Sequence, residues 1–173
     1  MNMTNSEISV NEAKQDKLFY VVSNTVIINS TDKTCLLLKR SETEKVLPGK
    51  WAFPGGKLEH LDVTRLLEEE NKSPIDGIDN ILGKLAVRET YEECGLKVDT
   101  ESGTIIKNKV FIRPDGVPVF MATLVAEYIG GAVVLEDGAF TDYAWVSEDE
   151  IDDYDCIDGV AQEAKHALTI QKV

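Results

Sequence analysis

A chain of 173 residues, 43% of them hydrophobic, is long enough to bury the core of one domain. Its 31 acidic and 18 basic residues give a net charge of −13 at pH 7, which excludes a nucleic-acid duplex as a partner because no basic patch offsets the phosphate charge. The chain has no apolar N-terminal segment, no run of about 20 apolar residues and no close pair among its three cysteines, so we expect a cytoplasmic protein without a membrane span or a disulfide framework.

The first part of the chain predicts a tail and a hairpin. Residues 1–16 are polar and rich in Asn and Glu, which is typical of a disordered tail, so the domain is expected to occupy residues 17–173. Residues 18–28 are predicted to form a strand that pairs, through a turn, with a second strand at residues 34–40. Arg40 ends the second strand and is interpreted either as a surface residue or as a guanidinium that binds substrate phosphate.

Two aromatic residues and a glycine-rich turn come next. Trp51 and Phe53 alternate with smaller residues, which favours packing into the sheet, while stacking on a nucleobase is the alternative. Pro54 has a fixed φ angle, and Gly55 and Gly56 permit positive φ and a close approach of the backbone to a ligand. The turn is therefore a candidate binding element.

The sequence of residues 61–77 predicts a segment that lies outside the main fold. Asp62 is a candidate N-cap for a short helix, with Val63, Leu66 and Leu67 on one face. Two interpretations remain open for this segment, a lid or substrate-selecting arm and a plain surface excursion.

A longer helix is predicted from residue 79 to Gly95. Its apolar stripe consists of Ile81, Leu82, Leu85 and Ala86, and the same stripe continues onto Glu89, Glu92 and Glu93. Carboxylates at this spacing repel one another, and burial against a sheet raises the cost. A divalent cation resolves the conflict, because Mg²⁺ and Mn²⁺ prefer oxygen ligands. We therefore interpret the helix as metal-binding, the alternative being a solvated acidic face.

The remaining sequence predicts more strands and a final helix. Strands are expected at residues 96–98, 103–113, 117–129 and 141–146, with a turn at residues 114–116. Glu136 lies in an acidic loop before the last strand, and an amphipathic helix opens at Asp158. Strands with helices between and after them predict an α/β fold, an α/β/α sandwich with a mixed central sheet.

The turn and the long helix together carry a recognisable pattern. Its residues are Gly56, Arg88, Glu89, Glu92, Glu93, Gly95 and Leu96. They resemble the box of the Nudix hydrolases, Gly-x5-Glu-x7-Arg-Glu-U-x-Glu-Glu-x-Gly-U, where U is a bulky apolar residue, and the turn looks MutT-like. Arg88 follows Gly56 by 32 positions where the box has fourteen, so an insertion of about 18 residues is expected, at residues 61–77. The box glutamate, counted back from Arg88, falls on Asn80, with Asp79 beside it as a substitute.

The resemblance also implies roles for individual residues. The residues implied to hold Mg²⁺ or Mn²⁺ are Glu89, Glu92, Glu93 and the backbone carbonyl of Gly56. Arg88 is expected to orient the glutamates, and Glu89 or Glu136 to take the proton from the attacking water. The residues implied to contact the substrate are Arg40, Trp51, Phe53, Gly55 and Gly56.

The activity implied by the resemblance is a metal-dependent pyrophosphohydrolase. Its substrate would be a nucleoside diphosphate linked to a group X, either a nucleoside triphosphate, oxidised or not, or a compound like ADP-ribose. The alternative is a catalytically weak domain that binds a nucleotide as a sensor or regulator. The sequence leaves open the identity of X and the oligomeric state, a homodimer being one option.

Overall fold

The computed structural model describes residues 19–113 and 116–170. The predicted tail at residues 1–16 and the first two residues of the predicted turn at 114–116 lie outside the described residues. In the described part of the chain, no helix is both long and apolar enough to cross a membrane.

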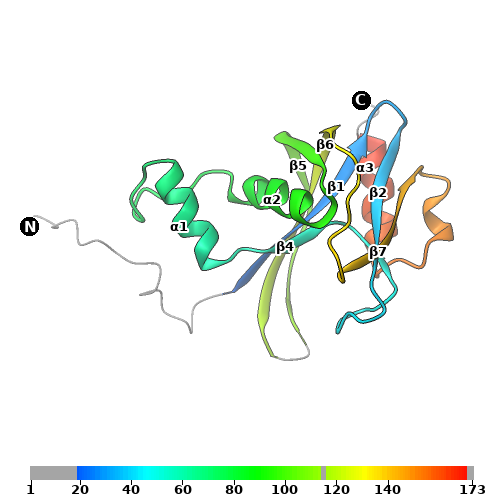
Figure 1. Ribbon diagram of the computed structural model, residues 1–173, viewed down its shortest axis with the longest axis horizontal. Coiled ribbons are helices and arrows are strands. Elements are labelled where there is room, and N and C mark those ends of the chain that lie inside the picture. The colour runs from blue at the N-terminus through cyan, green and yellow to red at the C-terminus, as the bar shows by residue number, and fades with distance from the viewer. Residues whose placement is uncertain (1–18, 114–115, 171–173) are drawn as a thin grey trace, which may run out of the picture.

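One mixed sheet forms the centre of the fold (Figure 1). Its strands are β1 (Tyr20–Asn29), β2 (Thr34–Arg40), β3 (Trp51–Ala52), β4 (Gly55–Lys57), β5 (Lys97–Ile112), β6 (Pro118–Gly130) and β7 (Phe140–Val146). Within the described residues the order is β3-β2-β1-β6-β5, with β4 paired to β1 and β7 paired to β2. β1 runs parallel to β6, and the other pairs are antiparallel.

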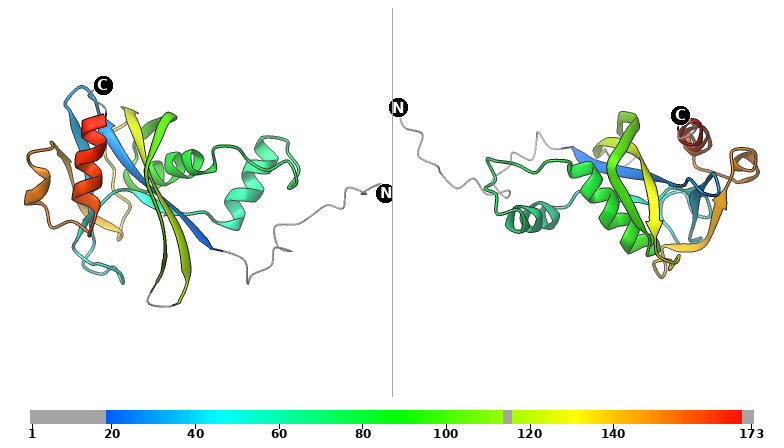
Figure 2. Two further views of the ribbon diagram at one scale, coloured as in Figure 1. Left: turned by 180° about the vertical axis from the view of Figure 1, so that it is seen from behind. Right: turned by 90° about the horizontal axis from the view of Figure 1, so that it is seen from above.

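Helices cover both faces of this sheet. α2 (Ile81–Cys94) lies on one face and α3 (Val160–Ile170) on the other (Figure 2, right). Val26 and Ile28 of β1 pack under α3, whereas Ile27 packs with Cys94 at the end of α2. Central strands that are apolar on both sides are expected where helices cover both faces. The predicted α/β/α sandwich with a mixed sheet is confirmed.

Several predicted boundaries differ from the observed ones by a few residues. The strands predicted at residues 96–98 and 103–113 are one continuous strand, β5, which is bulged opposite β6. The segment after β7 forms a short 3₁₀ helix, η3 (Ile151–Asp153), ahead of α3. The helix predicted within residues 61–77 is α1 (His60–Glu69), which lies beside α2 at one end of the molecule (Figure 1).

The C-terminal end of α2 is fixed in a way that matters for the site. Gly95 caps it in the left-handed conformation (φ 71°), as its position predicted. The loop after β6 then docks on the last turn, where the Val134 N–H donates to the Cys94 carbonyl at 3.0 Å. The Glu136 N–H donates to the Glu93 carbonyl at 2.9 Å, which holds Glu136 beside the box helix.

Candidate active site

The Gly55-Gly56 turn lies directly against the glutamates of α2. The Gly55 N–H donates to Oε2 of Glu93 at 2.8 Å. A Cβ on Gly56 would lie 1.9 Å from Oε1 of Glu89, so only glycine leaves room for that carboxylate. Neither glycine adopts a positive φ, so that part of the sequence-based expectation is wrong, whereas close approach of neighbouring atoms accounts for both glycines.

Glu93 is a partly buried carboxylate in an unusual electrostatic setting. Burial raises its pKa to about 8. The negative charges of Glu89 and Glu136 contribute to this rise, while the Gly55 N–H and the charge of Arg40 oppose it. Glu93 therefore lies where added positive charge would favour the ionised form.

Arg88 gathers acidic groups from two helices. Its guanidinium donates to Glu89 at 2.6 Å and to Glu92 at 2.7 Å on its own helix. It also donates to Asp62 of α1 at 3.0 and 3.1 Å and to the Lys57 carbonyl of β4 at 3.2 Å. Burial raises the pKa of Glu89, and the charge of Arg88 opposes that rise. The predicted role of Arg88 as an orienting residue agrees with these contacts.

Asp62 corrects the sequence-based placement of the box acid. Counted forward from Gly56, the glutamate of Gly-x5-Glu falls on Asp62, and this buried carboxylate contacts Arg88. Counting back from Arg88 led instead to Asn80, which precedes α2 in a left-handed conformation, and to Asp79, whose side chain is 98% exposed. The expected insertion would separate the two halves of the box, and only the forward count avoids it. The inserted length itself stays a prediction.

Glu92 departs from the predicted inward stripe. Its side chain is 51% exposed, whereas Thr90 and Cys94 are the buried residues of that part of α2. The buried side of the helix thus runs through Glu89, Thr90, Glu93 and Cys94, with Glu92 at its margin. An arginine partner one turn away explains how Glu92 is held there.

The oxygen ligands available in this region suit a divalent cation, although they do not surround one common point. Over residues 19–113 and 116–170, no three His, Cys, Asp or Glu side chains lie close enough together to hold a metal ion in the observed conformations. The donor set consists only of carboxylate and carbonyl oxygens, which Mg²⁺ and Mn²⁺ prefer. Glu92 has to leave Arg88 to join Glu89 and Glu93, and its exposure allows that rotation.

The structure brings some predicted substrate residues to the site and not others. Arg40 is close enough to Glu93 to affect its pKa, but its guanidinium donates to Glu44 at 2.5 Å and to the Val46 carbonyl at 3.0 Å. Phe53 is 5% exposed and belongs to the apolar cluster under α3. Trp51 packs against the same cluster and meets Tyr154 edge to face at 5.0 Å. The core interpretation is therefore confirmed for Phe53, whereas Trp51 is partly buried at the edge of the same cluster.

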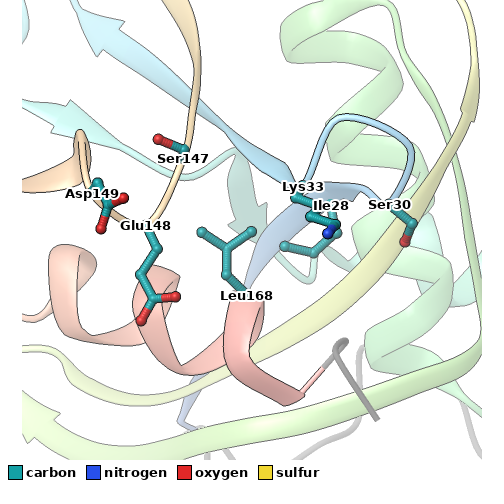
Figure 3. Close-up of a pocket in the computed structure, with 7 residues that line it drawn as sticks. All are labelled: Ile28, Ser30, Lys33, Ser147, Glu148, Asp149 and Leu168. Atoms are coloured by element: carbon teal, nitrogen blue, oxygen red, sulfur yellow. The ribbon is translucent and has the colours of Figure 1, made fainter.

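A separate cavity lies away from the glutamates. It has a volume of about 510 Å³ and lies between the β1–β2 turn and the end of α3, with Glu148 and Asp149 at one side and Lys33 at the other (Figure 3). Its described wall contains none of the predicted site residues, so the candidate site is the surface between the Gly55-Gly56 turn and α2.

Similar solved structures share this architecture. The MutT protein from Methanosarcina mazei Go1 is 21% identical, with 92% of this chain and 99% of that chain covered and a TM-score of 0.60. A Nudix hydrolase from Nitrosomonas europaea is 18% identical over 90% of this chain and 91% of that chain, with a TM-score of 0.60. The Nudix domain of Shewanella oneidensis NrtR, crystallised with ADP ribose, is 14% identical over 99% of this chain and 100% of that chain, with a TM-score of 0.66.

These likenesses establish the fold: the chain has the Nudix fold. No protein-family model matches the chain, and no curated protein matches it in sequence.

Proposed function

We propose that this chain is a divalent-metal-dependent Nudix hydrolase that splits a pyrophosphate bond in a nucleoside diphosphate linked to a group X. The observation that carries the proposal is the contact between turn and helix, where Gly55 binds Glu93 and Gly56 leaves space for Glu89. A merely solvated acidic helix gives no reason to bury Glu93, because burying a carboxylate is costly without compensation.

The roles follow from the contacts. Glu89, Glu92 and Glu93, with the carbonyl of Gly56, are the donors that would hold the cation. When bound, the cation supplies charge neutralisation at the phosphate oxygens and lowers the pKa of water. Arg88 keeps two of these carboxylates in place and is itself fixed by Asp62.

The reaction needs one water and one proton acceptor. The water oxygen forms a bond to one phosphorus, and the bridging P–O bond breaks with its electrons on the leaving phosphate. One water proton passes to a carboxylate, which is Glu89 or Glu136, and from there to solvent. The Glu89 carboxylate accepts a hydrogen bond from Arg88. Glu136 is exposed, and its backbone N–H, which donates to the Glu93 carbonyl, holds it next to Glu93. Removal of the acting base abolishes the acidic limb of the pH–rate profile, which distinguishes the two.

The test is a panel of nucleotides with products identified by mass. Nucleoside triphosphates, ADP-ribose and dinucleoside polyphosphates are incubated with Mg²⁺, and release of a nucleoside monophosphate or phosphate is expected for at least one. Glu93→Gln should lower that rate by more than about 100-fold, because losses in the outer shell alone cost 10–100-fold. Glu101→Gln, an exposed position on β5, is the matched control. Turnover that survives Glu93→Gln would exclude the proposal.

A second candidate function is nucleotide binding with little turnover. One observation favours it: the similar NrtR domain was crystallised with ADP ribose. Calorimetric binding of ADP-ribose with no product from any nucleotide in the panel would support this candidate over the hydrolase.

A further inference from the structure

Two buried hydroxyl groups in the layer between β1 and α2 lack a hydrogen-bond partner. Thr25 of β1 and Thr90 of α2 are both 0% exposed. Among residues 19–113 and 116–170, neither Thr25 Oγ1 nor Thr90 Oγ1 makes a hydrogen bond. Most buried hydroxyls in folded proteins have a partner, because an unsatisfied one is costly, so two of them in one layer call for an explanation.

Both side chains point into this layer. Val26 and Ile28 of β1 face α3, and strand side chains alternate, so Thr25 faces α2. Thr90 belongs to the buried side of α2, one helical turn after Ala86. The box pattern has a bulky apolar residue at the position of Thr90, so a hydroxyl at that position is particular to this chain.

Two contacts fix how β1 and α2 lie against each other. Near the start of α2, the Ser23 hydroxyl donates to the Leu82 carbonyl at 3.4 Å. At the end of α2, Cys94 packs in one apolar cluster with Ile27. The strand and the helix therefore run alongside each other between these two contacts (Figure 1).

The two threonines occupy corresponding positions between these contacts. Thr25 is the middle residue of the strand segment 23–27. Thr90 lies two residues, or about 3 Å of helix rise, past the middle of the helix segment 82–94. The two hydroxyls are thus opposite each other, and the small side chain of Ala86, itself 0% exposed, leaves room beside them.

This layer supports the candidate active site from behind. The Thr25 N–H donates to the Pro54 carbonyl at 2.9 Å, directly before the glycine turn. Thr90 lies on α2 between Glu89 and Glu93, the two carboxylates that meet this turn. A group that joins the two hydroxyls therefore sets the distance between the turn and these carboxylates.

We propose that Thr25 and Thr90 bind one shared internal water molecule, and that this water fixes the distance between α2 and the glycine turn. A threonine hydroxyl donates one hydrogen bond and accepts two, so one water bonds to both side chains. Buried waters take two to four polar partners, and the Ser23 hydroxyl on the same face of β1 offers a third. The two threonines are then positioning residues for Glu89 and Glu93. The consequence for the metal site rests on the proposed function.

The first test is a set of thermal melts in EDTA with isosteric substitutions. Valine keeps the shape of threonine and removes the hydroxyl. Thr25→Val or Thr90→Val alone leaves the water and the other hydroxyl short of a partner, so each Tm should fall by roughly 2–8 °C. The double variant makes the layer apolar and expels the water, so its Tm should return to within about 2 °C of the wild type.

Thr34 supplies the matched control for these melts. Its hydroxyl also lacks a partner among the described residues, but it pairs with Asn29, four strand residues or about 13 Å along β1 from Thr25. Thr34→Val should not lower the Tm, and its effect should add to that of Thr90→Val. A higher Tm in Thr25→Val or Thr90→Val would overturn the proposal, because it would mean that each hydroxyl is buried without a water. Additive losses in the double variant would overturn it as well.

A binding measurement tests the positioning role. Mn²⁺ is titrated into each variant and free Mn²⁺ is read from its EPR signal, so no turnover is needed. The Kd should rise by about 10-fold or more in Thr90→Val and stay within about twofold in Thr90→Ser, which keeps the hydroxyl. An equal Kd in the wild type and Thr90→Val would refute the positioning role.

The melts separate this inference from the proposed function, because they need neither metal nor substrate. The expected Tm pattern without Mn²⁺ binding or hydrolysis of any nucleotide would refute the hydrolase and support the shared water. Hydrolysis together with higher Tm values in the single variants would refute the shared water and support the hydrolase.

Discussion

At the scale of single residues, Gly56 shows how tightly the turn and helix are fitted. The space of its missing Cβ is filled by the Glu89 carboxylate, which is the mobile end of a side chain. Gly56→Ala should therefore leave the fold intact and displace Glu89 from Arg88. We expect at least a 10-fold loss of turnover, comparable with other losses of carboxylate positioning, with an unchanged far-UV spectrum.

The matched control for this change is Gly83→Ala on α2. The nearest atoms that a Cβ there would meet belong to the side-chain amide of Asn80, which is exposed and able to turn away. Alanine also favours the helix by roughly 0.5–1 kcal/mol over glycine. The Tm of Gly83→Ala should rise slightly and its activity should stay normal, so equal losses in both variants would contradict the special role of Gly56.

Glu93 predicts an unusual dependence of stability on pH in the metal-free protein. Its pKa is raised from 4.5 to about 8 in the folded chain. Between these pH values the folded state holds a proton more tightly than the unfolded state does, so stability falls as pH rises, by up to about 1.4 kcal/mol per pH unit. The full contribution is present below pH 4.5 and is lost above about pH 8.

Thermal melts in EDTA from pH 5.5 to 8.5 measure this slope. Glu93→Gln carries no ionisable group at that position, so its slope should be flatter, whereas Glu101→Gln should follow the wild type. Identical slopes in the wild type and Glu93→Gln would mean that the carboxylate ionises without penalty.

At the scale of elements, ion pairs link α1 and the residue after it to α2. Asp62 of α1 contacts Arg88, and Glu70 after α1 pairs with Lys84 of α2. Asp62→Asn should weaken the hold on Arg88 and lower kcat by about 10–100-fold, as expected for an outer-shell partner. Asp79→Asn is the control, because that carboxylate is exposed, pairs with Lys72 and should be dispensable. A larger loss from Asp79→Asn would restore the placement inferred by counting back from Arg88.

How far the sequence predicted these elements depends on what each pattern measures. The extent of α2 followed from its apolar spacing and from Gly95, which are local signals. The position of Glu92 did not, because helical spacing alone cannot say where the buried side ends. For Phe53 the sequence favoured the core and left stacking on a nucleobase as the alternative, and the packing of Phe53 under α3 shows that it lies in the core.

The position of the box acid, counted back from Arg88, was mispredicted for a different physical reason. An insertion in a loop costs little free energy, so it separates two halves of a motif without disturbing either half. A residue spacing counted across an insertion no longer matches the motif, whereas a spacing counted within one half still does. Asp62 belongs to the half that starts at Gly56, and of the two candidate acids it is Asp62 that contacts Arg88, whereas Asp79 contacts Lys72.

At the scale of the whole molecule, the effect of net charge on stability has to be separated from the effect of metal binding. A net charge of −13 means that any salt stabilises the fold by screening self-repulsion. Mg²⁺ should stabilise it further through the site at Glu93. At a concentration 100 times its Kd, a ligand adds about 2.7 kcal/mol, which corresponds to roughly 5–10 °C in Tm for a domain of this size.

The decisive measurement is the difference in Tm between Mg²⁺ and NaCl at equal ionic strength. In the wild type the two melting curves should differ, and in Glu93→Gln they should nearly coincide, because screening survives the substitution and site binding does not. Glu101→Gln removes one negative charge, as Glu93→Gln does, but from an exposed part of β5. It should therefore keep the full difference in Tm between Mg²⁺ and NaCl. If all three proteins respond to Mg²⁺ only as they do to NaCl, the acids of α2 are a solvated surface and the metal-dependent chemistry proposed for them has no basis.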